Sequence, residues 1–176
     1  MKAIRLGLAL LALLLVAPTG AATQEDPTGE WLVAKRVARI RIINCDNKFW
    51  GYLSWEEQAG IDSNNPDPDK RSRPTLGMPI LLGMTQSKAN EWKGEIYNAQ
   101  DGRKYSSNIS LLNPDTLKVQ GCVLGILCGG ENWTRVGMQT PIAPPPAKKS
   151  TTPKNPAKNP DEALCQELPA AAGLSH

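Results

Sequence analysis

Short apolar runs, each bounded by Gly, Pro, Asn or Asp, divide the central part of the chain. Within residues 37–43, Ala38, Ile40 and Ile42 alternate with Arg39 and Arg41. This period of two is typical of a strand with one buried face. The pattern predicts eight strands, at residues 29–34, 37–43, 49–55, 78–85, 91–98, 104–112, 116–124 and 131–136.

The connections between these runs are mostly short, and Asp101-Gly102 is a strong hairpin signal. Residues 23–136 contain no convincing segment of helical period. We therefore expect an all-β fold, either a sandwich or a small antiparallel eight-stranded barrel. A barrel of eight strands encloses room for side chains or for one small ligand.

The two ends of the chain differ from this domain in composition. Residues 1–22 combine a basic start, an apolar run and a small-residue cleavage site, which predicts a cleavable secretory signal too short to span a bilayer. Residues 137–176 are rich in Pro and Lys, and we expect a disordered tail in which residues 160–168 form at most a marginal isolated helix. The folded domain is then residues 23–136, in a periplasmic or secreted protein with no membrane span once the signal is removed.

Charge and residue types exclude several functions. The domain holds 14 basic and 14 acidic residues, so it offers no basic surface for nucleic acid. His176 is the one histidine of the chain, which leaves no Ser-His-Asp or Cys-His pair. The sequence also has no Cys-x-x-Cys and no glycine-rich phosphate loop. We expect no metal, no cofactor and no enzymatic activity.

Four cysteines in an exported chain indicate at least one disulfide. Cys122 and Cys128 would lie roughly 20 Å apart in one straight strand. Gly125, together with the following Gly129 and Gly130, favours a tight turn that brings the two sulfurs together, so we favour a Cys122–Cys128 disulfide. Cys45 and Cys165 either pair or remain free.

The connection at residues 56–75 is the longest. Pro66 and Pro68 rule out a central strand there but suit the start of a helical turn. In one interpretation Arg71 and Arg73 bind an anionic head group at the barrel mouth.

In the other interpretation Asp67 and Asp69 cap the helical turn and pair with those arginines, which orders a long lid. The balance of acids and bases in this segment favours the structural role.

The first and last predicted strands carry two residues that can contact each other. In an up-and-down barrel these strands are neighbours, so Trp31 and Arg135 can stack at the barrel floor. The Gly29-x-Trp31 opening and the late Arg135 resemble the lipocalin and calycin pattern. The alternative is that the tryptophans at the two ends of the domain are unrelated, and in either case the role is structural.

A wider resemblance covers residues 28–136. The runs Asn65-Pro66-Asp67-Pro68, Arg71-Ser72-Arg73-Pro74, Leu76-Gly77 and Trp133-Thr134-Arg135-Val136 are similar to the bacterial DUF2147 family. The resemblance implies an exported protein of unknown activity with a lipocalin-like barrel, and structural roles for Asn65, Pro66, Asp67 and Gly77. Many members carry a second Cys shortly after the position of Cys45, where this chain has Phe49, which puts a disulfide at Cys45 in doubt.

Two functions follow as hypotheses. The first is a lipocalin-like carrier of a small hydrophobic or lipidic ligand, with an open cavity near residues 56–75. Its candidate ligand-binding residues are Trp50, Tyr52, Trp92, Tyr97, Arg71 and Arg73. The second is a barrel filled by its own aromatic side chains that contacts envelope proteins or the cell wall through its surface and tail.

Overall fold

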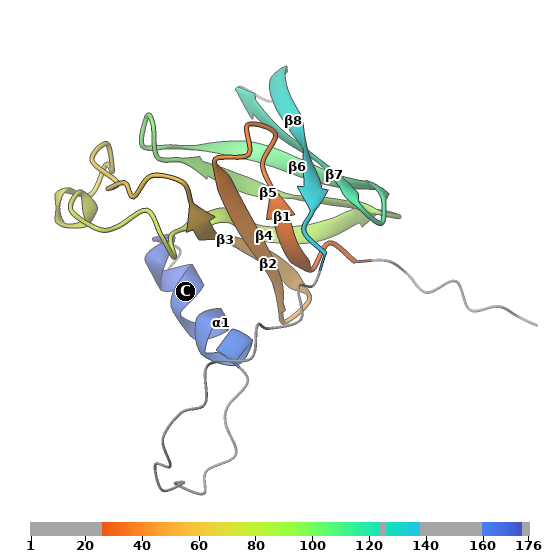
Figure 1. Ribbon diagram of the computed structural model, residues 1–176, viewed down its shortest axis with the longest axis horizontal. Helices are drawn as coiled ribbons and strands as arrows, with labels where there is room; N and C mark the ends of the chain where they lie inside the picture. The colour runs from red at the N-terminus through yellow and green to blue at the C-terminus, as the bar shows by residue number, and fades with distance from the viewer. Residues whose placement is uncertain (1–25, 124–125, 138–159, 174–176) are drawn as a thin grey trace, which may run out of the picture.

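The chain folds into a closed antiparallel barrel whose eight strands follow sequence order, as the computed structural model shows (Figure 1). The structure describes residues 26–123, 126–137 and 160–173. The predicted signal and most of the predicted tail lie outside these ranges. The strands are β1 (Gly29–Leu32), β2 (Ala38–Cys45), β3 (Lys48–Glu56), β4 (Pro79–Lys88), β5 (Glu91–Asn98), β6 (Arg103–Asn113), β7 (Thr116–Val123) and β8 (Leu127–Arg135). The predicted eight-stranded antiparallel barrel is confirmed.

Strand β8 begins earlier than the sequence pattern predicts. Gly129 and Gly130, which we expected to belong to a turn, pair with Gly121 and Gln120 of β7. The ladder continues to Val123 and Leu127, because two glycines weaken a strand without preventing its pairing. The β7–β8 hairpin is therefore paired as far as Val123 and Leu127, and these two residues with Ile126 form its described tip.

The floor of the barrel joins its first and last strands. Trp31 lies opposite Arg135 in the β1–β8 ladder, and the guanidinium carbon of Arg135 lies 4.2 Å from the centre of the Trp31 ring. The indole Nε1 of Trp31 donates to the carbonyl of Pro27 at 2.9 Å, and Arg135 donates to the carbonyls of Thr28 and Pro114. This contact closes one end of the barrel, as the placement of the two residues in the sequence suggests.

Alternation along β3 divides the buried side chains between two clusters. Phe49 and Leu53 point inward, whereas Trp50 and Tyr52 point out of the barrel. The interior cluster lies inside the barrel and consists of Trp31, Ile40, Ile42, Phe49, Leu53, Leu81, Met84, Trp92, Ile109, Leu111, Leu117, Val119 and Trp133. The outer cluster lies on the outside of the wall and consists of Ile43, Cys45, Trp50, Met78, Leu82, Tyr97 and Leu168.

Helix α1 (Pro160–Ala171) lies against the outside of the barrel wall (Figure 1), and its residues Leu164, Cys165 and Leu168 pack in the outer cluster. A disulfide joins Cys165 of the helix to Cys45 of β2, with the two Cα atoms 5.4 Å apart, and Leu168 is buried. The expectation that residues 137–176 are disordered throughout is therefore wrong for this segment. An isolated helix of this length is marginal, but the disulfide and the burial of Leu168 supply the missing tertiary contacts. No helix in the described ranges is long and apolar enough to cross a membrane.

Candidate functional site

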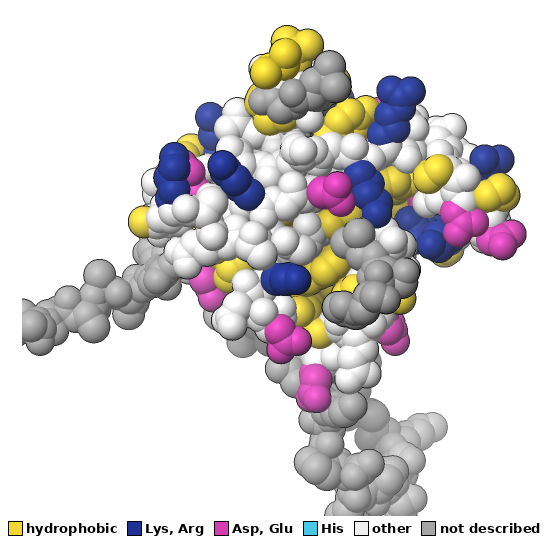
Figure 2. All heavy atoms as spheres, turned by 180° about the vertical axis from the view of Figure 1, so that it is seen from behind, with side chains coloured by type: hydrophobic (Ala, Val, Ile, Leu, Met, Phe, Trp, Pro, Cys, Tyr) yellow, Lys and Arg dark blue, Asp and Glu magenta, His cyan; other side chains and the backbone are white. Residues whose placement is uncertain are grey.

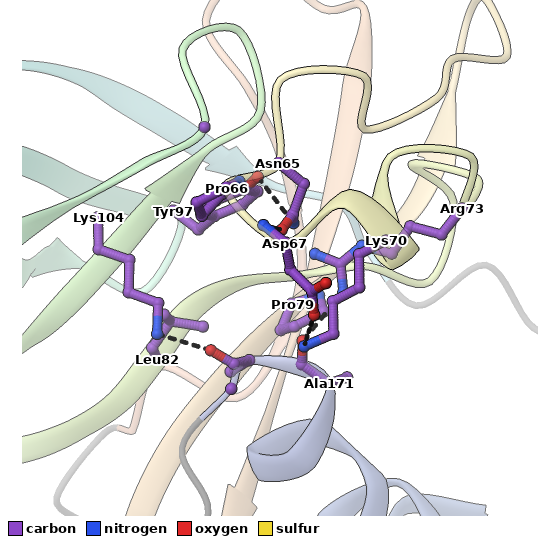
Figure 3. Close-up of a pocket in the computed structure, with 13 residues that line it drawn as sticks. Asn65, Pro66, Asp67, Lys70, Arg73, Pro79, Leu82, Tyr97, Lys104 and Ala171 are labelled. Atoms are coloured by element: carbon purple, nitrogen blue, oxygen red, sulfur yellow. Dashed lines mark hydrogen bonds and ion pairs between the residues drawn. The ribbon is translucent and has the colours of Figure 1, made fainter.

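A pocket of about 400 Å³ lies where three parts of the molecule meet (Figure 3). These parts are the β3–β4 loop (residues 57–78), the β5–β6 turn and the C-terminal end of α1. The residues that line it are Asn65, Pro66, Asp67, Lys70, Arg73, Pro79, Leu82, Tyr97, Gly102, Lys104, Ala171, Ala172 and Gly173. The pocket is therefore on the outside of the barrel wall, at the edge of the outer cluster.

A buried carboxylate, Asp62, organises the loop that forms one wall. Its Oδ1 accepts from the Tyr97 hydroxyl at 2.7 Å, and its Oδ2 accepts from Asn65 Nδ2 at 2.6 Å. Arg73 completes the network with Nε at 3.0 Å and Nη2 at 2.9 Å from Oδ2. A carboxylate that is fully buried needs such partners to offset its lost hydration. The network thus fixes Tyr97 and Arg73 in the pocket wall.

The same contacts change the pKa of the Tyr97 hydroxyl. Burial of its phenol, and then the hydrogen bond to Asp62, raise the pKa of Tyr97 to about 12. The folded chain therefore favours the protonated hydroxyl, which donates to Asp62.

The predicted helical turn in this loop is present as η1 (Pro68–Lys70). The Asp67 side chain caps it by accepting from the backbone N–H of Asp69 at 3.1 Å. The ion pairs differ from those expected, because Arg73 pairs with Asp62 and Arg71 donates to the carbonyl of Asn65 at 2.9 Å. Asp67 pairs instead with Lys70, at 3.4 Å.

Two glycines allow the loop to close against the barrel. Gly77 has a φ of +82°, and its N–H donates to the carbonyl of Leu53 at 2.7 Å, which returns the chain to β3. Gly102 has a φ of +70°, and a Cβ there would lie 1.8 Å from the carbonyl oxygen of Asn64. Only glycine permits this approach of the β5–β6 turn to the loop.

Basic side chains hold the end of α1 at the pocket. Arg73 Nη1 donates to the carbonyl of Ala171 at 2.9 Å, and Lys104 Nζ donates to that of Ala172 at 2.6 Å. Such contacts satisfy carbonyls that a helix C-terminus leaves unpaired. Arg73 is committed to both Asp62 and the helix. Lys70 contacts Asp67 in a half-exposed ion pair, and the contact of Lys104 with Ala172 is exposed.

The structure distributes the candidate ligand-binding residues over three places. Tyr97 and Arg73 line the pocket, and Arg71 lies beside it in the same loop. Trp92 is in the interior cluster, with its ring 5.5 Å from that of Phe49 in an edge-to-face contact. Trp50 and Tyr52 belong to the outer face that α1 covers.

Sequence reasoning missed Asp62, Lys70 and Lys104. Asp62 resembles any other loop acid in the sequence, and its burial arises only when Tyr97 packs over the loop. Lys70 and Lys104 are 34 positions apart in sequence and line one pocket because the β3–β4 loop packs against the β5–β6 turn.

The barrel interior is filled near its floor and open near the opposite end. A second pocket of about 280 Å³ lies at this mouth, with Ile96, Val119 and Trp133 among its lining residues. Gly121 and Gly129 face each other there without side chains to fill the space. Within residues 26–123, 126–137 and 160–173, no group of three His, Cys, Asp or Glu side chains gathers into a metal site.

The closed barrel places the chain in the class of lipocalin-like barrel proteins. Its fold is similar to that of protein HP1028 from Helicobacter pylori, described as belonging to the lipocalin family, with a TM-score of 0.59 and 20% sequence identity. The similarity covers 64% of this chain and 84% of HP1028.

The family is shown by the sequence itself. The model of the family described as an uncharacterized protein conserved in bacteria (DUF2147) matches residues 29–135, and this chain belongs to that family. The resemblance seen in the sequence is confirmed. A comparison with curated proteins finds no match.

Proposed function

We propose that this chain binds a small hydrophobic or lipidic molecule with an anionic group, in the pocket between the β3–β4 loop and the end of α1. The observation that carries the proposal is the combination of an apolar wall and a basic rim in one cavity. Pro79, Leu82 and the Tyr97 ring supply the wall, and Lys70 and Lys104 supply the rim. A volume of about 400 Å³ lies within the range usual for small-ligand sites.

The charges of the pocket favour an anion. The Lys70–Asp67 pair is half-exposed, with its charged atoms 3.4 Å apart, and such pairs contribute little. Lys104 is held by a neutral carbonyl, and no carboxylate pairs with it among the described residues. A carboxylate or phosphate of the ligand would gain charge-assisted hydrogen bonds from both lysines.

We propose a periplasmic or secreted location for this binding. Two disulfides, Cys45–Cys165 and Cys122–Cys128, support it because such bonds persist in oxidising compartments. The apolar run and cleavage site of residues 1–22 support it independently.

The first test is native mass spectrometry of the protein purified from periplasm, followed by lipid analysis of a solvent extract. We expect a stoichiometric small molecule with an anionic group. A fluorescence titration with decanoate then compares the wild type with Lys70→Gln/Lys104→Gln, for which we expect a Kd about tenfold higher, a loss of about 1.4 kcal/mol.

The matched control is Lys48→Gln/Lys93→Gln, which removes the same charge from exposed positions away from the pocket. We expect its Kd to equal that of the wild type. Equal Kd values for both double variants, or no binding of any ligand by the wild type, would refute the proposed site.

The filled interior favours a second candidate function. Four aromatic rings, Trp31, Phe49, Trp92 and Trp133, occupy the barrel, which suits a module that contacts the cell wall rather than a carrier. The tail carries Lys148, Lys149, Lys154 and Lys158, whose side chains could contact anionic wall polymers. Cosedimentation with peptidoglycan sacculi tests this function: it predicts binding that is lost when the four lysines are changed to Gln.

A further inference from the structure

The tip of the β7–β8 hairpin is an apolar projection. Val123 is 47% exposed, Ile126 is 79% exposed and Leu127 is 69% exposed. Figure 2 shows it as a hydrophobic knob that stands out from the body of the molecule. Exposed aliphatic side chains that gather in this way mark interaction sites more often than isolated ones do.

The tip is uncharged and its base is fixed. Residues 119–130 contain no Asp, Glu, Lys or Arg. The disulfide Cys122–Cys128 joins the two strands directly below the tip, where the Cα atoms are 4.0 Å apart. The disulfide holds the two strands together at the base of the tip.

Other exposed apolar side chains lie at the same end of the barrel. Val37 and Trp55 are at the β1–β2 turn and the end of β3, and Ile61 and Leu76 are in the β3–β4 loop. At the opposite end of the barrel, Leu112 is exposed close to the end of β6. The apolar surface is therefore concentrated around the open mouth.

We infer that the β7–β8 tip inserts into the surface of a lipid bilayer, so that the mouth of the barrel faces the membrane. A second copy of this chain is a poor occupant, because a stable interface buries about 800 Å² per partner and two convex tips meet over a small area. A bilayer needs no complementary groove, and it accepts apolar side chains at its interface.

The charge of this end indicates what kind of binding to expect. The β1–β2 turn carries Lys35 and Arg36, while β3 ends in Glu56 and is followed by Glu57. Since both signs are present, the attraction to anionic lipids is weak. Association should depend on the apolar tip, and salt should change it little.

The test is flotation of the exported, processed protein with phosphatidylethanolamine–phosphatidylglycerol vesicles. We expect the wild type to float, and Ile126→Asp/Leu127→Asp to bind at least tenfold more weakly. Leu112→Asp is the matched control, since it places an acid at an exposed aliphatic position at the other end of the barrel, and it should float like the wild type. All variants share one N-terminus, so the difference between them reports the tip.

Thermal unfolding of each variant verifies that the barrel is intact. The inference is overturned if the wild type remains in the protein fraction, or if the tip variant floats as the wild type does. It is also overturned if light scattering without vesicles shows a dimer that the tip variant dissociates, because the tip would then be a contact between copies. Decanoate binding should be unchanged in the tip variant, which separates this test from that of the proposed ligand site.

Discussion

The two faces of β3 bury their side chains in different ways. Inside the barrel, Phe49 and Leu53 pack against residues of neighbouring strands, and the hydrogen-bonded wall surrounds them on all sides. Outside, Trp50 belongs to a cluster with Met78 of the β3–β4 loop and Leu168 of α1. The disulfide that holds this helix joins Cys45 and Cys165, which are 120 residues apart in sequence. The interior depends on the barrel itself, whereas the outer cluster depends on parts that can move without opening the barrel.

This difference assigns separate tasks to the two regions. A closed ladder resists local opening, so the interior should unfold only with the whole domain. The outer cluster borders the pocket and is held by one disulfide and a small set of polar contacts. The proposed ligand site lies in this outer region, where an entry path can open without loss of the barrel.

Substitution of one tryptophan in each region tests this contrast most strongly. Trp92 and Trp50 are both buried, with 2% and 5% of their surfaces exposed. We expect Trp92→Ala to lower the free energy of unfolding by about 4 kcal/mol, because the closed barrel cannot collapse around the cavity. For Trp50→Ala we expect about 2 kcal/mol, since α1 can shift inward. Denaturant unfolding measures both, and equal losses would contradict the distinction.

Loss of the buried Asp62 carboxylate should have the next largest effect on the free energy of unfolding. Asp62→Ala leaves Arg73, Asn65 and Tyr97 without their shared acceptor, and we expect a loss of about 3 kcal/mol. The matched control is Asp69→Ala, an acid of the same loop at an exposed position, for which we expect less than about 0.5 kcal/mol. Similar values for the two variants would mean that the network does not stabilise the loop.

Removal of the helix tether should act locally. In Cys45→Ser/Cys165→Ser we expect faster amide exchange in α1 and around Trp50, at a cost of about 2 kcal/mol. Exchange in the interior strands should remain slow. In Cys122→Ser/Cys128→Ser the change should instead be confined to the β7–β8 tip. Uniformly faster exchange in the first variant would show that the barrel depends on α1.

The sequence predicts the barrel better than the outer cluster. The strands depend on local signals, whereas the outer cluster depends on contacts between distant segments. Alternation within a strand and turn residues between strands are local signals, so the eight strands and the Trp31–Arg135 floor follow from them. The face of β3 that points inward does not follow, because Trp50 and Phe49 are equally apolar. The docking of α1 depends on Cys45 finding Cys165, which composition alone does not predict.

The residues of the pocket are likewise only partly predictable from the sequence. Tyr97 and Arg73 stand out in the sequence as an aromatic and a base in suitable segments, and both line the pocket. Lys104 does not stand out, because it lies in a strand of mixed polar residues and reaches the pocket only when the helix ends beside it. Whether such a residue lies at the pocket depends on contacts between segments that are distant in sequence.

The smallest effect concerns the hydroxyl of Tyr97. Tyr97→Phe removes one donor to Asp62 and should cost about 1 kcal/mol near neutral pH. The pKa of Tyr97 is about 12 in the folded chain and about 10 in an unfolded chain, so between these values the folded state holds the proton more tightly. The stabilisation by this hydroxyl is fully present below pH 10 and is lost as pH rises through 12.

The difference in unfolding free energy between the wild type and Tyr97→Phe should therefore shrink over that interval. All other residues are the same in both proteins, so the difference isolates Tyr97. Urea unfolding of both at several values between pH 8 and about pH 11.5 measures it. A constant difference over this range would mean that the phenol is not held by Asp62, and the outer network would then resemble an ordinary exposed loop rather than a buried one.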